Sequence, residues 1–320
     1  MKITDFKHAG LMQALSDKHQ VLLDIIGYKP LHYVDIPVHG NIGDLLIMQG
    51  TLAFFDKYGL VPKVSAPAFA YDQQWIEPGD VIVFHGGGNF GDLYSEYGMQ
   101  PLREQVVSNN LGSRIIVLPQ TIHFSSPEKQ LRSARLFRTH PDVHICVRDQ
   151  NSYEIAQAFS DHVYLLPDMA HQLYPVNAEV VTGMAGSLLI KRTDDEKSIQ
   201  QDTARFGTVT MTDWPQLVGQ REWHIDRFRR AMHVMHKLGM GWLGNRLLAD
   251  LWAGYANKLV SNAIRLFSSY ELIVTDRLHG HILACLMDKP SIVLDNSYGK
   301  NSRYVSAWTL DSDLVSLQQA

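Results

Sequence analysis

The chain has 320 residues, of which 45% are hydrophobic and 19% are charged, a composition typical of a folded globular protein and unlike that of a disordered one. Since a domain usually holds roughly 100–200 residues, this length predicts two lobes instead of a single core. The net charge of −4 argues against a nucleic-acid-binding protein, so local cations must hold any anionic ligand.

The N-terminus and the two cysteines favour a cytoplasmic protein. The segment MKITDFKHAG lacks the apolar core of a signal peptide, and no apolar run approaches the roughly 20 residues that span a bilayer. Cys146 and Cys285 lie in apolar runs without metal-type spacing, so we expect neither a disulfide nor a zinc site. Any membrane contact is expected to be peripheral.

The first half of the chain alternates short β-branched runs with helical stretches. Residues 5–26 have apolar positions near helical spacing and predict an amphipathic helix. Buried strands are then predicted at 31–38, 62–66, 81–84, 114–118, 143–147 and 163–167. This alternation is typical of a parallel, doubly wound sheet, which binds ligands at the carboxyl ends of its strands.

The pattern loosens around 173–183, so we divide the chain into a first domain, 1–178, and a second, 179–303. The second domain is expected to contain strands at 186–192, 207–214, 271–277 and 290–297, a long helical region at 221–268 and a helix at 279–287. The tail, 304–320, is expected to cross back to the first domain. The predicted fold class is α/β, with two such domains facing a cleft.

The first motif, HGNIGD at 39–44, follows a predicted strand and precedes an apolar helix. Its glycines permit a tight turn, and the helix N-terminus offers free N–H groups to an oxygen-rich ligand. Asn41 and Asp44 could bind sugar hydroxyls, and Asp44 could act as a base. The alternative is an ordinary helix cap, because Asn and Asp are common N-cap residues.

The second motif, HGGGNFGD at 85–92, contains the dinucleotide-binding pattern G-x-G-x-x-G. That reading requires an acidic residue about 20 positions on, and the segment 106–111 has none. We therefore expect no nicotinamide or flavin cofactor. The glycines still indicate close approach of a ligand or a neighbouring backbone, with His85, Asn89 and Asp92 as candidate hydroxyl contacts.

The third motif, TDRLHGH at 275–281, places Arg277 and His279 at a strand-to-helix corner. A guanidinium beside helix N-terminal amides is a strong site for phosphate or carboxylate. His279 can donate to the same anion or transfer a proton near neutral pH. The alternative is a surface pair of Asp276 and Arg277 with a helix-capping histidine.

Two further cations, Arg148 and Lys300, follow predicted strands and are candidate anion ligands, although either could be a plain surface charge. A metal site is not expected, because His279 and His281 are two positions apart and cannot share a helix face.

The ordered set of motifs resembles the polysaccharide pyruvyl transferase family from about 33 to 308. The residues that carry the resemblance are HGNIGD, VIVFHGGGNFGD, LPQTI (118–122), VRDQNSYE (147–154), TDRLHGH and LDNSYGKN. The resemblance implies two Rossmann-like lobes, similar to the B-type glycosyltransferase fold. It also implies phosphoenolpyruvate as co-substrate, no cofactor, and a saccharide acceptor in exopolysaccharide or cell-surface glycan biosynthesis.

The resemblance makes Arg148, Arg277 and His279 donor-binding and catalytic residues. A donor with both phosphate and carboxylate carries roughly three negative charges, and Lys300 could supply a further cation. We assign His279 as the acid that protonates the donor methylene, and Asp44 or Asp92 as the base. The acceptor is expected to contact the first-domain loops through His39, Asn41, Asp44, His85, Asn89 and Asp92.

Two other functional classes compete with this interpretation. A glycosyltransferase with a nucleotide-sugar donor could use the same architecture, with Asp295 clamping the ribose. A binding protein without catalysis is less favoured, because it has little use for a histidine beside the anion-binding arginine.

The segment 221–252 combines basic and aromatic residues. Up to Arg246 it holds six Lys or Arg residues against Glu222 and Asp226. Such a stretch could rest on an anionic membrane, where a lipid-linked acceptor would be found. Alternatively, its aromatic residues pack into the second lobe and its arginines form a solvated face.

Overall fold

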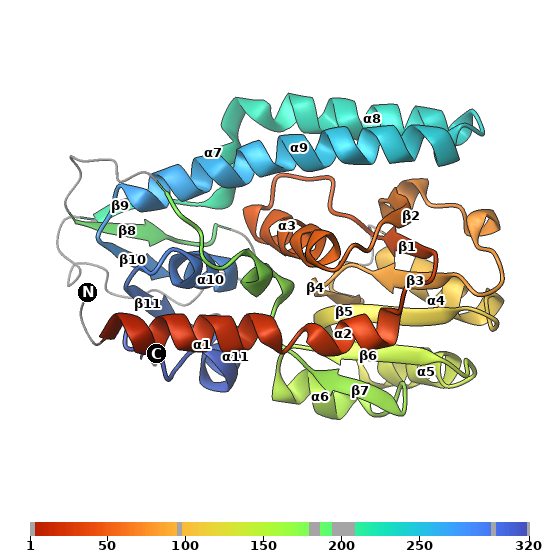
Figure 1. The fold of residues 1–320 in the computed structure, drawn as a ribbon, viewed down its shortest axis with the longest axis horizontal. Helices are drawn as coiled ribbons and strands as arrows, with labels where there is room; N and C mark the ends of the chain where they lie inside the picture. Colours follow the sequence, from red (N-terminus) through yellow and green to blue (C-terminus); the bar gives the residue numbers. More distant parts are fainter. Residues whose placement is uncertain (1–3, 95–97, 179–185, 194–208, 296–298, 319–320) are drawn as a thin grey trace.

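The computed structural model describes residues 4–94, 98–178, 186–193, 209–295 and 299–318. Two lobes lie side by side, each built on a parallel β-sheet with helices packed around it (Figure 1). The mixed α/β class and the division into two sheets are thereby confirmed. Residues 179–185 lie outside the described part of the chain, so the boundary between 178 and 179 stays a prediction.

The sheet of the first lobe runs in the order β2-β1-β3-β5-β6-β7, with β4 paired to β5. All these pairs are parallel. The strands are β1 (Leu31–Val34), β2 (Pro62–Ala66), β3 (Val81–Phe84), β4 (Gly87–Gly91), β5 (Arg114–His123), β6 (Val143–Val147) and β7 (His162–Leu165). The connecting helices are α2 (Gln20–Ile26), α3 (Ile42–Lys57), α4 (Met99–Asn109), α5 (Pro127–Phe137) and α6 (Gln150–Ala156), with short 3-10 turns η1 (Ala68–Ala70), η2 (Gln73–Trp75) and η4 (Met169–Leu173).

The sheet of the second lobe runs in the order β12-β11-β10-β8-β9, again with every pair parallel. Its strands are β8 (Ser187–Ile190), β9 (Val209–Thr212), β10 (Leu272–Thr275), β11 (Ser291–Leu294) and β12 (Val315–Gln318). Its helices are α7 (Trp214–Val218), η6 (Gly219–Arg221), α8 (Glu222–Lys237), α9 (Gly241–Ser268), α10 (Leu278–Leu286) and α11 (Lys300–Trp308).

The predicted strands of both domains are confirmed, and two further strands were missed. β4 lies in the glycine-rich motif, where the composition disfavours a strand, but the long β5 offers it a parallel partner. Each sheet also reverses its strand order once, between β1 and β3 and between β8 and β10. Ligands of such sheets bind beyond the carboxyl ends of the strands at the reversal.

The terminal segments make contacts outside their own halves of the sequence. Within the tail, residues 315–318 pair with β11 as the edge strand β12, while Trp308 of α11 donates its indole N–H to the carbonyl of Arg148 in the first lobe. Helix α1 (Thr4–Asp17) covers the second lobe (Figure 1). Met12 and Leu15 share a buried cluster with Val305 and Val315, among others. The predicted single helix over 5–26 is therefore two helices: α1 packs against the second lobe and α2 against the first.

The long helices α8 and α9 form an antiparallel hairpin that reaches from the second lobe across the first (Figure 1). Trp252 of α9 is fully buried, and its indole N–H donates to the carbonyl of Pro37 at 2.7 Å. The side chain of Gln49 on α3 donates to the carbonyl of Ala253 at 3.0 Å. The hairpin thus fastens the second lobe to the first.

Helix α3 packs closely against η4, the segment that follows β7. A Cβ added at Gly50 would lie 2.1 Å from the carbonyl oxygen of Met169, which is far inside van der Waals contact. Glycine is required here because the two backbones touch. The contact also sets the position of the polypeptide next to Asp168.

We expect Gly50→Ala to destabilise the protein by about 1–3 kcal/mol, because the new methyl group must push α3 away from η4. Urea denaturation measures the loss. Gly10→Ala on α1 is the matched control, since an added Cβ there meets no described atom within 4 Å. Equal stabilities of the two variants would contradict the close approach.

Candidate functional site

A cleft of about 880 Å³ lies between the lobes, at the carboxyl ends of both sheets. Nine of the sequence-predicted site residues line it: His39, Asn41, Asp44, His85, Asn89, Arg148, Arg277, His279 and Lys300. Both lobes contribute, so the complete site exists only when the two face each other. The motifs of the sequence, although spread over some 260 positions, meet here.

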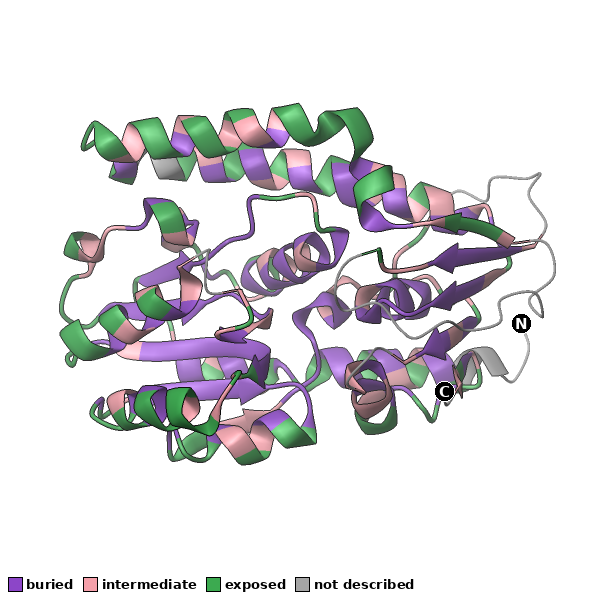
Figure 2. Ribbon diagram, turned by 180° about the vertical axis from the view of Figure 1, so that it is seen from behind, coloured by how far each residue is buried: buried purple, intermediate pink, exposed green. Residues whose placement is uncertain are grey.

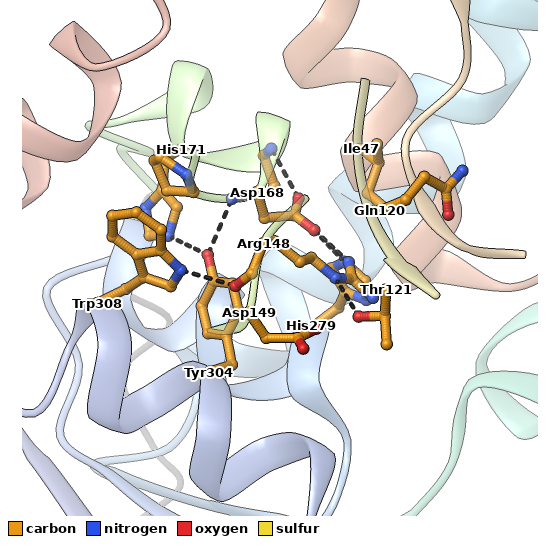
Figure 3. A network of polar contacts seen from close by, with 12 residues as sticks. Ile47, Gln120, Thr121, Arg148, Asp149, Asp168, His171, His279, Tyr304 and Trp308 are labelled. Carbon is orange, nitrogen blue, oxygen red and sulfur yellow. Dashed lines mark hydrogen bonds and ion pairs between the residues drawn. The ribbon is translucent and has the colours of Figure 1, made fainter. Parts of the chain in front are cut away.

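Asp168 occupies the centre of a polar network at this lobe boundary (Figure 3). This fully buried carboxylate follows β7 in the first lobe and accepts a hydrogen bond from the guanidinium of Arg148. It also lies 3.2 Å from Nε2 of His279, which belongs to the second lobe. Burial alone would raise the pKa of Asp168, but the neighbouring His279 and Arg148 outweigh it and the pKa is lowered. Asp168 is therefore ionised and joins the two lobes electrostatically.

Two aromatic residues of the second lobe, Tyr304 and Trp308, form hydrogen bonds with this network. The hydroxyl of Tyr304 on α11 accepts from the backbone N–H of Asp168 at 3.1 Å and lies 3.0 Å from Nε2 of His171. Burial lowers the pKa of His171 to about 3, so its neutral ring accepts the tyrosine proton. Trp308 donates its indole N–H to the carbonyl of Arg148 at 2.8 Å. These contacts fix the backbone on both sides of the Arg148–Asp168 pair.

Arg277 is oriented by a residue that the sequence patterns did not single out. Its Nε and Nη2 donate to the two oxygens of the buried Asp213 at 2.5 and 2.7 Å. Asp213 also accepts from the backbone N–H groups of Thr193 and Trp214. Arg277 thus makes a two-point contact of the kind expected with a ligand, but its Nε–Nη2 edge makes this contact with a carboxylate of the protein.

Lys300 and Arg148 converge from opposite lobes above Gly88 in β4. A Cβ added at Gly88 would lie 3.1 Å from Nζ of Lys300 and 3.4 Å from Nη2 of Arg148. Nε of Arg148 donates to Oγ1 of Thr121 at 3.0 Å, which turns the guanidinium toward this point. The missing side chain of Gly88 leaves the cations a common space in the cleft.

The motif at 39–44 forms the predicted helix cap and lines the cleft. Asn41 is the N-cap of α3 and accepts from the N–H of Gly43 at 3.0 Å. Asp44 lies in the first turn, 3.7 Å from Nε2 of His39, and both side chains are part-exposed in the cleft. A Cβ at Gly43 would lie 2.6 Å from Nδ1 of His279, so the helix N-terminus also receives the histidine ring.

The motif at 85–92 divides into buried and surface residues. His85 is buried, with Nδ1 2.7 Å from the hydroxyl of Tyr33 and Nε2 without a hydrogen-bond partner among the described residues. Burial lowers the pKa of His85 to about 3, so its ring is neutral. Asn89 lines the cleft, but its amide is engaged by Asp35 and Gln120 at 3.1 and 2.8 Å.

Asp92 lies outside the cleft. Its carboxylate accepts from Nζ of Lys129 at 2.8 Å and from the N–H of Ser125 at 2.7 Å. These contacts lower the pKa of Asp92 to about 2, although partial burial acts in the opposite direction. The predicted acceptor and base roles of Asp92 are therefore not compatible with its place, because β4 ends at Gly91 and the Asp92 carboxylate is bound by Ser125 and Lys129 at the start of α5.

Several residues of the site were not anticipated from the sequence. Asp168 follows the predicted strand at 163–167, in LPD, and this position was the signal that could have found it. Asp213 falls within the predicted strand at 207–214, but it follows the shorter β9 of the structure, in TDW. Helix α8 turns one face into the cleft with Glu222, Asp226, Arg229, Arg230 and His233. Phe69 of η1 lines the same part of the cleft and is 39% exposed. The arginines of this face thus have a place in the cleft wall.

Comparison with known proteins places this geometry in a family. Residues 41–298 match the family model described as polysaccharide pyruvyl transferase, which covers the cleft motifs from Asn41 onward. The chain belongs to the polysaccharide pyruvyl transferase family.

Relatives agree with this assignment. The chain is 39% identical over 311 residues to the Bacillus subtilis (strain 168) protein named "Putative pyruvyl transferase EpsO", covering 95% of this chain and 92% of that protein. It is 28% identical over 297 residues to pyruvyl transferase 1 of Schizosaccharomyces pombe, covering 88% of this chain and 70% of the relative. A Klebsiella pneumoniae protein of uncharacterised function has a crystal structure that aligns over the full length of both chains, with a TM-score of 0.57 and 19% identity, and shares the fold.

Gly43→Ala should reduce activity strongly without unfolding the protein. Alanine favours the helix by about 0.5–1 kcal/mol, but its methyl group would displace the ring of His279. Gly254→Ala on α9 is the control, because an added Cβ there meets no described atom within 4 Å. Thermal denaturation and steady-state kinetics of both variants test the expectation; a fully active Gly43→Ala enzyme would show that the ring need not stay there.

Arg277→Lys should lower the free energy of unfolding by about 1–3 kcal/mol, because lysine cannot replace the two-point contact with the buried Asp213. Arg277→Ala should cost about 3–5 kcal/mol, since it leaves that carboxylate buried without its cation. Chemical denaturation measures both. If the guanidinium fork served the ligand alone, the lysine variant would keep wild-type stability.

Proposed function

We propose that this protein transfers the pyruvyl group of phosphoenolpyruvate to two hydroxyls of a saccharide, forming a pyruvate ketal and releasing phosphate. The observation that carries the proposal is the convergence of Arg148 and Lys300 at Gly88 from two lobes, with His279 in the same cleft and in contact with Asp168, the partner of Arg148. A small trianionic donor needs such a cluster in a protein whose net charge is −4.

The proposed fold is that of B-type glycosyltransferases, with two Rossmann-like lobes. Both sheets reverse their strand order at the cleft, which supports this comparison. The proposed setting is the cytoplasmic assembly of exopolysaccharide or cell-surface glycans, with no cofactor beyond the co-substrate.

On the donor side, Lys300 and Arg148 would bind phosphate and carboxylate oxygens above Gly88. Arg148 is held in place by Thr121 and Asp168 before the donor arrives, and this lowers the cost of ordering it on binding. Arg277 would contribute through the part of its guanidinium that Asp213 does not engage. His279 lies beside this cluster and is oriented by Asp168.

The proposed reaction adds one proton to the donor carbon and removes one proton from each of the two hydroxyls. His279 would protonate the methylene carbon of the donor, generating an oxocarbenium-like centre that the first hydroxyl attacks. The second hydroxyl then displaces phosphate at the same carbon. One hydroxyl proton returns to the enzyme, through Asp44 as base, and the other leaves with the phosphate. Asp44 lies at the start of α3, adjacent to the ring of His279 over Gly43.

The acceptor would bind across the first-lobe loops and the face of α8. His39, Asn41 and Asp44 are within the cleft, and the buried ring of His85, whose Nε2 has no hydrogen-bond partner among the described residues, lines it beside them. The side chain and the backbone of Asn89 are already bonded, so we expect Asn89 to shape the cleft wall instead of binding the acceptor directly. On the opposite wall, the charged groups of α8 and the exposed ring of Phe69 are suited to hydroxyls and to the apolar face of a sugar ring.

A nucleotide-sugar glycosyltransferase is the alternative on this fold, and two observations count against it. The family match describes pyruvyl transfer. Asp295, the residue suited to a ribose, caps the start of α11 by accepting from the N–H of Ser302 at 3.2 Å.

Phosphate release from phosphoenolpyruvate, measured across a panel of saccharide acceptors, tests the proposal. Acceptor-dependent release is expected, and protection against heat by a nucleotide diphosphate but not by phosphoenolpyruvate would favour the alternative.

His279→Asn should lower kcat by about 10²–10⁴-fold while donor affinity changes little, because asparagine can still donate to Asp168 but cannot transfer a proton. His162→Asn, on the exposed edge strand β7, should leave kcat unchanged. Near-normal kcat with a raised KM in His279→Asn would reduce His279 to a ligand-binding role.

A further inference from the structure

The outer side of the α8–α9 hairpin carries exposed apolar residues. Of the fifteen large hydrophobic side chains that are exposed in the described chain, seven belong to this hairpin. We name them the outer hairpin residues: Trp223, Val234, Leu238, Met240, Trp242, Leu247 and Leu251, each between 47% and 66% exposed. A soluble helix pair usually buries such residues, so their concentration on one supersecondary element calls for a partner.

Helical geometry separates this face of α8 from the other two. Ile225 and Met232 are buried, while Asp226 and His233 line the cleft. Trp223, Val234 and Leu238 recur at helical spacing on the remaining side, with Arg227 between them. Figure 2 shows exposed positions along the outermost edge of α8. In Figure 1 the hairpin forms the outer layer of the molecule, with the cleft-lining elements beneath it.

Cations accompany the apolar residues. Arg227, Lys237 and Arg246 are exposed, and the guanidinium of Arg227 lies 5.3 Å from the ring centre of Trp223. Of the acidic residues of the hairpin, Glu222 and Asp226 line the cleft and so face another way. Asp250 is exposed beside Leu251, but the three cations outnumber it. The face is therefore locally basic on a protein whose net charge is −4.

Tryptophan and leucine interleaved with arginine and lysine are the composition of a helix that lies in a membrane interface. A nucleic acid would leave the aliphatic residues without apolar contacts. Two copies of this basic face would repel each other. None of the helices in the described ranges is long and apolar enough to cross a bilayer, so contact must be parallel to the surface.

We propose that the outer hairpin residues, with Arg227, Lys237 and Arg246, bind the surface of an anionic lipid bilayer. The inference is independent of pyruvyl transfer, because it concerns a face of α8 that lies outside the cleft. It has a consequence for substrate access: the same helix rests on the bilayer with one face and lines the cleft with another. A saccharide carried on a lipid would then meet the cleft at the height of the headgroups.

Flotation with phosphatidylcholine vesicles, with and without phosphatidylglycerol, tests the proposal on the full-length protein. Binding is expected to the anionic vesicles only, and to fall as salt rises from about 0.1 M to about 1 M. Each cation near the surface contributes roughly a fivefold factor, so Arg227→Ala/Lys237→Ala/Arg246→Ala should bind about 100-fold more weakly. Leu238→Ser/Leu247→Ser should also weaken binding, by about tenfold per residue.

The control is Lys7→Ala/Arg132→Ala/Arg135→Ala, which removes the same charge from exposed positions on α1 and α5, at the opposite side of the molecule in Figure 1. This variant should bind like wild type, and pyruvyl transfer to a soluble acceptor should be unchanged in all three variants. Absence of binding at low salt, or an equal loss in the control, would overturn the proposal. So would a concentration-dependent dimer that Leu238→Ser/Leu247→Ser dissolves, since a second copy would then occupy the face.

Discussion

A buried carboxylate between an arginine of one lobe and a histidine of the other is the constraint on which this structure depends. Asp168 is removed from water completely, which is costly for an ionised group unless charged partners surround it. Arg148 supplies one partner from the same lobe and His279 a second from the other. Closure of the lobes removes Asp168 from water, and the contacts with Arg148 and His279 offset that cost. One buried carboxylate thus links the orientation of the lobes to the geometry of the site.

The same requirement explains why each of the two cleft arginines that were predicted from the sequence has an aspartate as its partner. Arg148 pairs with Asp168 and Arg277 with Asp213, so both guanidinium groups are rigid in the absence of a ligand. A fixed cation needs no rearrangement when charge develops during a reaction, which is the main advantage of preorganised sites. The aspartates also reduce the repulsion among cations that would otherwise crowd an empty cleft. Lys300, at the first turn of α11, completes the cluster from the second lobe.

The parts of the site that could be predicted from sequence are those set by local order. Strand-to-helix corners place Arg277, His279 and Arg148 at the cleft, because the carboxyl ends of parallel strands share one edge. Asp168 and Asp213 escaped prediction because a single acid after a strand resembles any helix cap. Asn89 and Asp92 belong to one motif, but only Asn89 lines the cleft. The sequence did not predict this difference, because the glycine-rich run gives no sign of the strand β4. No periodicity within α8 reveals which of its three faces meets the cleft, because that depends on a lobe far away in the sequence.

Helix α1 has a consequence for how the chain reaches this state. His8 lies within 2.6 Å of the hydroxyl of Ser312, a partner 304 residues further along. During synthesis the apolar side of α1 therefore stays uncovered until residues 304 positions further along have been added. The second sheet, in turn, lacks its cover until α1 packs on it. Docking of α1 is thus a late, long-range event, which exposes apolar surface on both partners while the intervening chain is being made.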